Sequence, residues 1–305
     1  MISKEEFLDK IRNYLILNKL DKKWVLFSSR VQAGRTCFYS ICLFVLIGIC
    51  FILKKTYTPS RSINLNDTQN NLLLFLGFLF VIFPIIAFFI FKKEQLTEEA
   101  KITSFIFNLF GFTTQKECIS KAILIKSGLF ENYPFLREDD SFSGQFLNTK
   151  FSISEYNLSA MGLDVKKNAF KNRVYIKLDL KKRYLAHTQV ISKKTSFVNY
   201  STRVNLEDVD FIKEFDVFST DQIEARTILT PVFIEKLKQL KLVFGGKSID
   251  VAFFDNIVLF AINTPDDVFQ AFPYKKLFLD LSFYERFYDE VRSIYDMIEI
   301  LQIMI

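Results

Sequence analysis

The chain has 305 residues, of which half are apolar and 16% are aromatic, and its mean hydropathy is +0.17. A soluble globule rarely carries so much apolar surface, so the composition argues for membrane spans. The whole formal charge of +6 lies in residues 1–91, and the neutral balance of residues 92–305 gives no indication of nucleic-acid binding.

The chain begins with a predicted amphipathic helical segment over residues 1–35. Ser3 and Glu6 have the spacing of a capping box, and Phe7, Ile11 and Leu15 recur every four residues. Because this segment precedes the first apolar stretch, that stretch does not look like a cleaved signal peptide.

Two uncharged apolar stretches follow, at residues 36–53 and 72–91. As helices they would be about 27 and 30 Å long, which matches the hydrocarbon thickness of a bilayer. Eight Lys and Arg residues flank the pair on its outer sides, against three in the connecting loop. The positive-inside rule therefore predicts a transmembrane helical hairpin over residues 36–91 with both termini in the cytoplasm.

The remaining residues predict a helical connector over 92–126, broken at Gly111, and a cytoplasmic α+β domain over 127–305. Residues 148–158, 173–180 and 187–192 are predicted strands, and 173–180 alternates strictly between apolar and polar side chains. Two apolar runs flank Asp255–Asn256, which predicts a hairpin covered on both faces. A long helix starting near Ser282 ends the chain. Hairpins without βαβ units indicate an antiparallel sheet packed against helices.

The stretch FSTDQIEARTILTP, residues 218–231, is unusually polar for this chain. Asp221 with Glu224, or Ser219 with Gln222, has capping-box spacing, and Thr230 before Pro231 marks a second helix start. Arg226 is either a solvated charge or an ion-pair partner of Asp221 or Glu224. We treat Asp221, Glu224 and Arg226 as a structural signature, with a recognition site as the alternative.

Several segments, taken in order, resemble one bacterial protein family. They are SGLF at 127–130, residues 137–155 and 169–191, the stretch from 205 to 240 that contains FSTDQIEARTILTP, and SIDVAFFDNIVLFAI at 248–262. The chain resembles the domain-of-unknown-function family 3137, a group of two-span membrane proteins. The resemblance implies a protein of the bacterial inner membrane with a cytoplasmic domain, often encoded near LemA-type membrane proteins, which are therefore an implied partner. It implies no reaction.

No residue pattern indicates catalysis, a cofactor or a metal. His187 is the only histidine, and it lies on a predicted strand without a nucleophile or an orienting partner. The triplet Glu138–Asp139–Asp140 lacks the spacing of a calcium loop. No glycine-rich phosphate loop is present. We therefore predict no catalytic, cofactor-binding or metal-binding residues.

The charges of the predicted domain are unevenly distributed. Residues 166–203 carry a net charge of +10, and residues 204–225 carry −6. Either two solvated surfaces neutralise each other, or a basic face contacts an anionic leaflet or an acidic partner. The candidate contact residues are Lys177, Lys181, Lys182, Arg183, Lys193 and Lys194.

The sequence thus favours a non-enzymatic, membrane-tethered binding or scaffolding module, with the lipid bilayer as one partner. The alternative is a membrane-anchored enzyme or sensor with an unrecognised site. A pocket of convergent polar groups around His187 or Arg226 would favour the alternative. A closed domain with an apolar or charged surface patch would favour the scaffold.

Overall fold

The computed structural model describes residues 2–19, 101–129, 137–157, 172–193, 201–265 and 280–303, with residues 86, 89, 90, 93, 97, 98, 100, 268 and 269 between them. The chain divides into two compact units. The first comprises Met1–Ile11, Ser104–Pro273 and Leu281–Ile305, and the second comprises Arg12–Thr103 and Tyr274–Asp280. The sheet lies in the first unit, which also includes parts of the predicted N-terminal segment and connector.

The predicted spans fall on the part of the chain outside this description. Residues 36–53 are wholly outside it, and of residues 72–91 only 86, 89 and 90 are described, all three of them helical. Among the helices that the structure does describe, none is both long and apolar enough to cross a bilayer.

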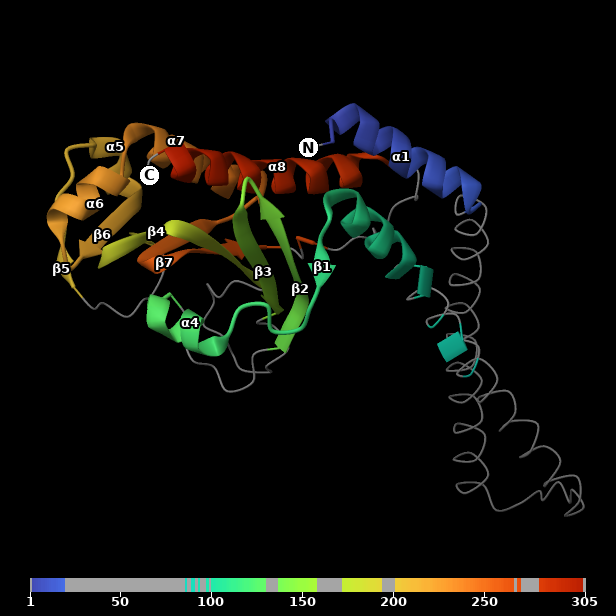
Figure 1. Cartoon of the computed structure of the whole chain (residues 1–305), viewed down its shortest axis with the longest axis horizontal. Coiled ribbons are helices and arrows are strands. Elements are labelled where there is room, and N and C mark those ends of the chain that lie inside the picture. Colours follow the sequence, from blue (N-terminus) through green and yellow to red (C-terminus); the bar gives the residue numbers. More distant parts are fainter. Residues whose placement is uncertain are drawn as a thin grey trace, which may run out of the picture. The chain divides into compact units, whose positions relative to one another are not determined.

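An antiparallel sheet packed against helices forms the first unit, as the sequence predicts (Figure 1). The central strand is β4, whose first part pairs with β3 and whose last part pairs with β6, while β7 pairs with both parts. The strands are β1 (Thr113–Thr114), β2 (Arg137–Phe146), β3 (Thr149–Asn157), β4 (Asn172–Ser192), β5 (Thr202–Arg203), β6 (Phe215–Ser219) and β7 (Ser248–Thr264).

The strand β7 folds back on itself. The backbone N–H of Lys247 donates to the carbonyl of Asn263 at 2.9 Å, and the Asn263 amide donates to Ser248 Oγ at 2.7 Å. A straight strand would separate these positions by about 50 Å. Asp255 at the midpoint has a φ of +49°, as tight hairpin turns require. The element therefore contains the predicted hairpin at Asp255–Asn256.

The strand β4 bends around the tip of this hairpin. Its residues 172–179 pair with 257–264 of β7, and its residues 188–190 pair with 251–253. The two arms of β7 therefore lie between the two arms of β4. Only Tyr184, opposite Asp255, continues the ladder between them. The predicted strands 173–180 and 187–192 are thus one element, joined by a segment that we call the β4 bend, residues 180–187.

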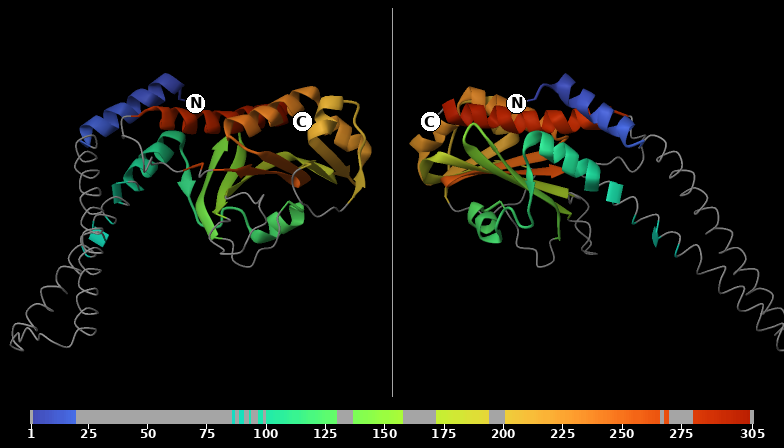
Figure 2. Two further views of the ribbon diagram at one scale, coloured as in Figure 1. Left: turned by 180° about the vertical axis from the view of Figure 1, so that it is seen from behind. Right: turned by 45° about the vertical axis from the view of Figure 1, so that its right-hand side comes forward.

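Both faces of the sheet are covered (Figures 1 and 2). Helices α7 (Pro231–Val243) and α8 (Ser282–Ile303) lie over one face, and α4 (Lys121–Ser127) lies under the other. On the α4 side, Tyr175 joins a buried cluster with Leu124 and Leu259. The remaining helices are α1 (Lys4–Leu17), an unlabelled helix at 101–110, α5 (Val209–Glu214) and α6 (Gln222–Ile228).

Aromatic side chains from α1, the helix at 101–110 and α8 pack together. Phe7 of α1 lies 5.3 Å from Phe110 and 5.6 Å from Tyr288, measured between ring centroids, and Phe110 lies 5.9 Å from Phe287. We call these four residues the aromatic junction. Around it, the Tyr288 hydroxyl donates to the carbonyl of Ile2 at 2.9 Å. Aromatic pairs at these distances stabilise the fold by more than the hydrophobic burial of their surface alone.

The predicted connector is not one helix. Gly111, at a φ of +69°, ends the helix at 101–110, as the sequence predicts. The chain then adds β1 to the edge of the sheet before α4 begins. The predicted C-terminal helix is confirmed as α8, in which Phe287, Val291, Ile298 and Leu301 are buried.

A buried carboxyl group lies within α8. Glu290 is 0% exposed, and Arg286 one turn earlier donates to its Oε1 at 2.8 Å. Its Oε2 has no hydrogen-bond partner. Burial raises the pKa of Glu290 to about 8, although the charge of Arg286 acts in the opposite direction. Burial therefore outweighs the ion pair, and the protonated acid is favoured in the folded state up to about that pH.

We predict that Glu290→Gln makes the folded chain more resistant to alkaline conditions. The folded pKa is raised, so the stability that protonation supplies is present below the unfolded pKa and is lost as the pH rises through about 8. The difference in unfolding free energy, variant minus wild type, should increase by on the order of 2–4 kcal/mol from pH 5 to pH 9. Denaturant unfolding of the purified full chain at several pH values measures this. Glu285→Gln, on the same helix, is the control, and its unfolding free energy should change with pH as that of the wild type does. If the unfolding free energies of wild type and Glu290→Gln change equally with pH, the prediction is contradicted.

Candidate functional site

The β4 bend interrupts the hydrogen-bond ladder of the sheet, and side chains from the polar stretch 218–231 replace the missing acceptors. The Glu224 carboxylate accepts from the backbone N–H groups of Leu185 at 3.2 Å and Ala186 at 2.6 Å. Thr220 Oγ1 accepts from the N–H of His187 at 3.0 Å. Backbone amides at a partly buried bend need such partners. The polar stretch therefore holds the bend in place.

Local capping explains why Glu224 is positioned there. The Asp221 carboxylate accepts from the N–H groups of Ile223 at 2.8 Å and Glu224 at 3.2 Å, which starts α6. Thr230 accepts from Phe233 at 3.2 Å and starts α7. Both predicted helix starts are confirmed, with Asp221 rather than Ser219 as the first cap. A recognition role for Asp221, Glu224 and Arg226 remains a prediction.

Arg226 does not pair with the acidic residues of its own helix. Its guanidinium donates to the carbonyl of Asn205 at 3.4 Å, and the side chain is exposed. Neither Asp221 nor Glu224 lies within ion-pair distance of it, because both carboxylates are directed at backbone N–H groups. The contact to Asn205 connects α6 to the segment that follows β5.

His187 lies at the end of the β4 bend and contacts α4. Its Nε2 is 3.2 Å from the carbonyl of Ser127, so this nitrogen carries the proton and donates. Gln189 donates to the same carbonyl at 2.9 Å. The imidazole stacks on Phe254 with 5.4 Å between centroids. Burial lowers the pKa of His187, and the charge of Lys126 lowers it further, while the Ser127 hydrogen bond and Asp255 oppose the shift.

The six candidate basic residues do not form one face. Lys177 is largely buried and pairs with Asp179 at 3.0 Å. Lys193 follows the far end of β4, where its N–H donates to the carbonyl of Glu214 at 3.0 Å, and Lys194 lies outside the described residues. Lys181, Lys182 and Arg183 lie together in the β4 bend. Among the described candidates these three are neighbours, and contact of the candidate residues with an anionic surface stays a prediction.

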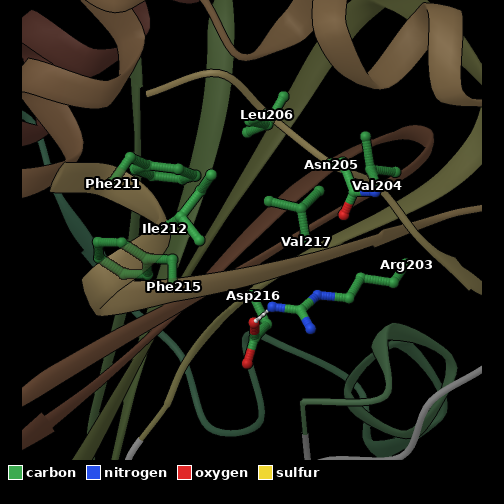
Figure 3. A pocket seen from close by; sticks show the side chains of 9 residues that line it. All are labelled: Arg203, Val204, Asn205, Leu206, Phe211, Ile212, Phe215, Asp216 and Val217. Carbon is green, nitrogen blue, oxygen red and sulfur yellow. Dashed lines mark hydrogen bonds and ion pairs between the residues drawn. The ribbon is translucent and has the colours of Figure 1, made fainter. Parts of the chain in front are cut away.

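A small groove lies beside β5 and β6 (Figure 3). Its empty volume is about 240 Å³, counting space open to solvent. Figure 3 shows apolar side chains around the hollow, with the Arg203–Asp216 ion pair along its lower side. Neither His187 nor Arg226 lines it. The lining residues are Arg203, Val204, Asn205, Leu206, Phe211, Ile212, Phe215, Asp216 and Val217.

The described part of the chain contains no group of three His, Cys, Asp or Glu residues that could hold a metal ion. Of the acidic triplet, Glu138 accepts from the N–H of Glu117 at 2.7 Å. Its carboxylate therefore has a structural contact with the segment before α4.

Comparison with known proteins supports the family resemblance. Residues 167–304, which include β4, the polar stretch, β7 and α8, match the family described as "Protein of unknown function (DUF3137)". The match covers slightly less than half of the chain. The family description assigns neither an activity nor a partner to the domain.

Other comparisons add little. No curated protein matches the chain. A solved structure, "crystal structure of the mycobacterial trehalose monomycolate transport factor A, TtfA", is similar over 65% of this chain and 91% of its own, with 11% identity and a TM-score of 0.37. Similarity at this level carries no conclusion about function.

We predict that Glu224→Ala destabilises the folded chain more than Asp221→Ala does. Loss of the Asp221 cap should cost about 1 kcal/mol. Loss of Glu224 leaves the amides of Leu185 and Ala186 without their acceptor, which should cost on the order of 2 kcal/mol. Denaturant unfolding of the purified full chain measures both.

Thr227→Ala is the matched control for these two variants. Its hydroxyl only donates back to the carbonyl of Ile223 in the same exposed helix, at 3.0 Å, so its removal should change stability by less than about 0.5 kcal/mol. If Glu224→Ala unfolds like Thr227→Ala, the carboxylate does not hold the bend.

We predict that His187 titrates below its usual range and has a structural role. Because its folded pKa is lowered, the unfolded state binds the proton first, and stability falls as the pH drops below about 6.5. His187→Gln can still donate to Ser127 and should remove this loss. As the chain has one histidine, an NMR titration of its imidazole reads the pKa directly. A midpoint at or above 6.5 would contradict the prediction.

Proposed function

We propose that the chain is an integral protein of the bacterial inner membrane and works as a non-enzymatic, membrane-mounted binding or scaffolding module. The observation that carries the proposal is the aromatic junction. Phe7 precedes the two apolar stretches in the sequence, Phe110 follows them, and their rings lie 5.3 Å apart within one compact unit.

This contact constrains the path of the chain between the two rings. The chain leaves the unit after Phe7 and returns before Phe110 at the same place. If the intervening residues enter a bilayer, they must therefore cross it an even number of times. Two apolar stretches of spanning length, flanked outside by eight basic residues, fit one hairpin with both ends in the cytoplasm.

The junction would also connect the domain rigidly to the proposed hairpin. Phe287 and Tyr288 come from α8, which lies over the sheet, so the helices before and after the proposed hairpin pack on the same element. Lys4 adds an ion pair to Asp289 at 2.9 Å. A domain mounted in this way would be held close to the bilayer and to neighbouring membrane proteins. A LemA-type protein is the partner class that the family resemblance suggests.

We predict that the loop at residues 54–71 is outside the cell membrane and the domain is inside. Starting from a chain whose four native cysteines are replaced by serine, Thr58→Cys and Leu242→Cys are compared in intact cells. Leu242 is 78% exposed on α7, so a cysteine there is accessible once the membrane is open. A membrane-impermeant thiol reagent should label Thr58→Cys in intact cells and Leu242→Cys only after permeabilisation.

Carbonate extraction provides the control, because an integral protein should stay with the membrane fraction. Labelling of Leu242→Cys in intact cells would show that the domain lies outside the membrane and would contradict the predicted topology. Recovery of the chain in the carbonate-soluble fraction would overturn the membrane proposal itself.

A further inference from the structure

We propose that the β4 bend docks on anionic lipid headgroups of the bilayer that anchors the chain. The inference rests on the proposed membrane function and names a lipid-binding surface for it. The surface consists of Lys181, Lys182, Arg183 and Leu185 of the bend with Ile223 of α6, and we call it the basic tip.

Two apolar side chains of the basic tip project into solvent. Leu185 is 91% exposed and Ile223 is 80% exposed. Ile223 precedes Glu224, whose carboxylate accepts from the Leu185 N–H, so the two side chains belong to one local structure. An exposed apolar group next to several basic groups suits the surface of an anionic bilayer. The apolar side chain enters the headgroup region while the cations meet phosphates.

Two of the basic side chains of the tip, Lys181 and Arg183, are exposed. Asp255, at the hairpin tip beneath the bend, pairs with Lys126 of α4. Asp179 pairs with Lys177, and Glu224 is occupied by backbone amides. Neither Lys181 nor Arg183 forms an ion pair with any described residue. The nearby carboxylates are thus engaged with other partners, and the side chains of Lys181 and Arg183 are exposed to an external anion.

The tip is also held in shape before any ligand arrives. Three backbone N–H groups of the bend are fixed by Glu224 and Thr220. Tyr184 is buried beneath it, where its ring packs edge-on against Phe253 at 5.4 Å. Because little conformational freedom remains to be lost, a few weak contacts with headgroups can suffice.

A lipid surface fits these features better than an acidic protein does. The groove beside β5 and β6 takes no residue from the tip, whereas Leu185 and Ile223 of the tip project into solvent. Protein interfaces depend on buried anchors in such recesses. The proposed anchor also keeps the bilayer at high effective concentration, which favours weak contacts with lipids.

The test uses the full chain in lipid-bilayer discs, with Trp24→Phe to remove the single native tryptophan. Leu185→Trp then reports on the tip, and Leu242→Trp is the matched control, since Leu242 is 78% exposed on α7 beside Lys241, which pairs with Glu214. The discs contain headgroup-region spin-labelled lipid and either phosphatidylcholine alone or phosphatidylcholine with phosphatidylglycerol. The measurement is quenching of the tryptophan fluorescence.

We expect strong quenching of Leu185→Trp in the discs with phosphatidylglycerol and little quenching of Leu242→Trp. Quenching at position 185 should fall to the control level without phosphatidylglycerol, at about 1 M salt where the Debye length is about 3 Å, and in the Lys181→Glu, Lys182→Glu, Arg183→Glu variant. The charge-reversed chain must show an unchanged far-ultraviolet circular dichroism spectrum, which separates lost docking from lost folding.

Each opposite outcome is decisive. One such outcome is that the chain that carries Leu185→Trp is incorporated into discs with phosphatidylglycerol and yet shows no more quenching than the Leu242→Trp chain. In that case docking of the tip on lipid is wrong, while the membrane proposal stands. Equal quenching with and without phosphatidylglycerol would overturn the role of charge. If the chain does not incorporate into discs at all, the proposed function fails and takes this inference with it.

Discussion

The pairing of β4 with β7 is the interaction on which the rest of the structure depends. Both arms of the β7 hairpin are almost completely buried, so each face must be covered by other elements. Helices α7 and α8 supply one cover and α4 the other. Burying one large apolar side chain contributes about 1.5–3 kcal/mol, and this hairpin buries nine. Its position between the arms of β4 therefore determines where every other element can pack.

The cost of that arrangement appears at the β4 bend. A strand that turns around a hairpin tip loses its ladder, and its amides need other acceptors. The polar stretch after β6 meets this need by starting a helix whose first turn holds Glu224 against the bend. The stretch is therefore not an isolated motif. Its Asp221 cap starts α6, the first turn of α6 positions Glu224, and the hydrogen bonds of Glu224 fix the shape of the exposed basic tip.

The aromatic junction and the basic tip are features of different kinds. The junction is formed by packed rings from α1, the helix at 101–110 and α8, and it brings together residues more than 100 positions apart. The tip is formed by exposed side chains on a local scaffold. In the proposed function the junction mounts the domain and the tip orients it on the bilayer. The two contacts depend differently on salt, because ring packing is insensitive to ionic strength and charge contacts with headgroups are screened by it.

The sequence by itself determined the local elements. Strict alternation predicted the first arm of β4, Asp255–Asn256 predicted the hairpin, and the caps at Asp221 and Thr230 predicted two helices, because each of these depends on neighbours within a few residues. It did not predict that 173–180 and 187–192 form one strand, that Glu224 holds the bend, or that Lys177 is paired while Lys181 and Arg183 are exposed. Those outcomes were decided by tertiary structure alone, since backbone amides and charges that are distant in sequence find their partners only when the arms of β4 close around β7.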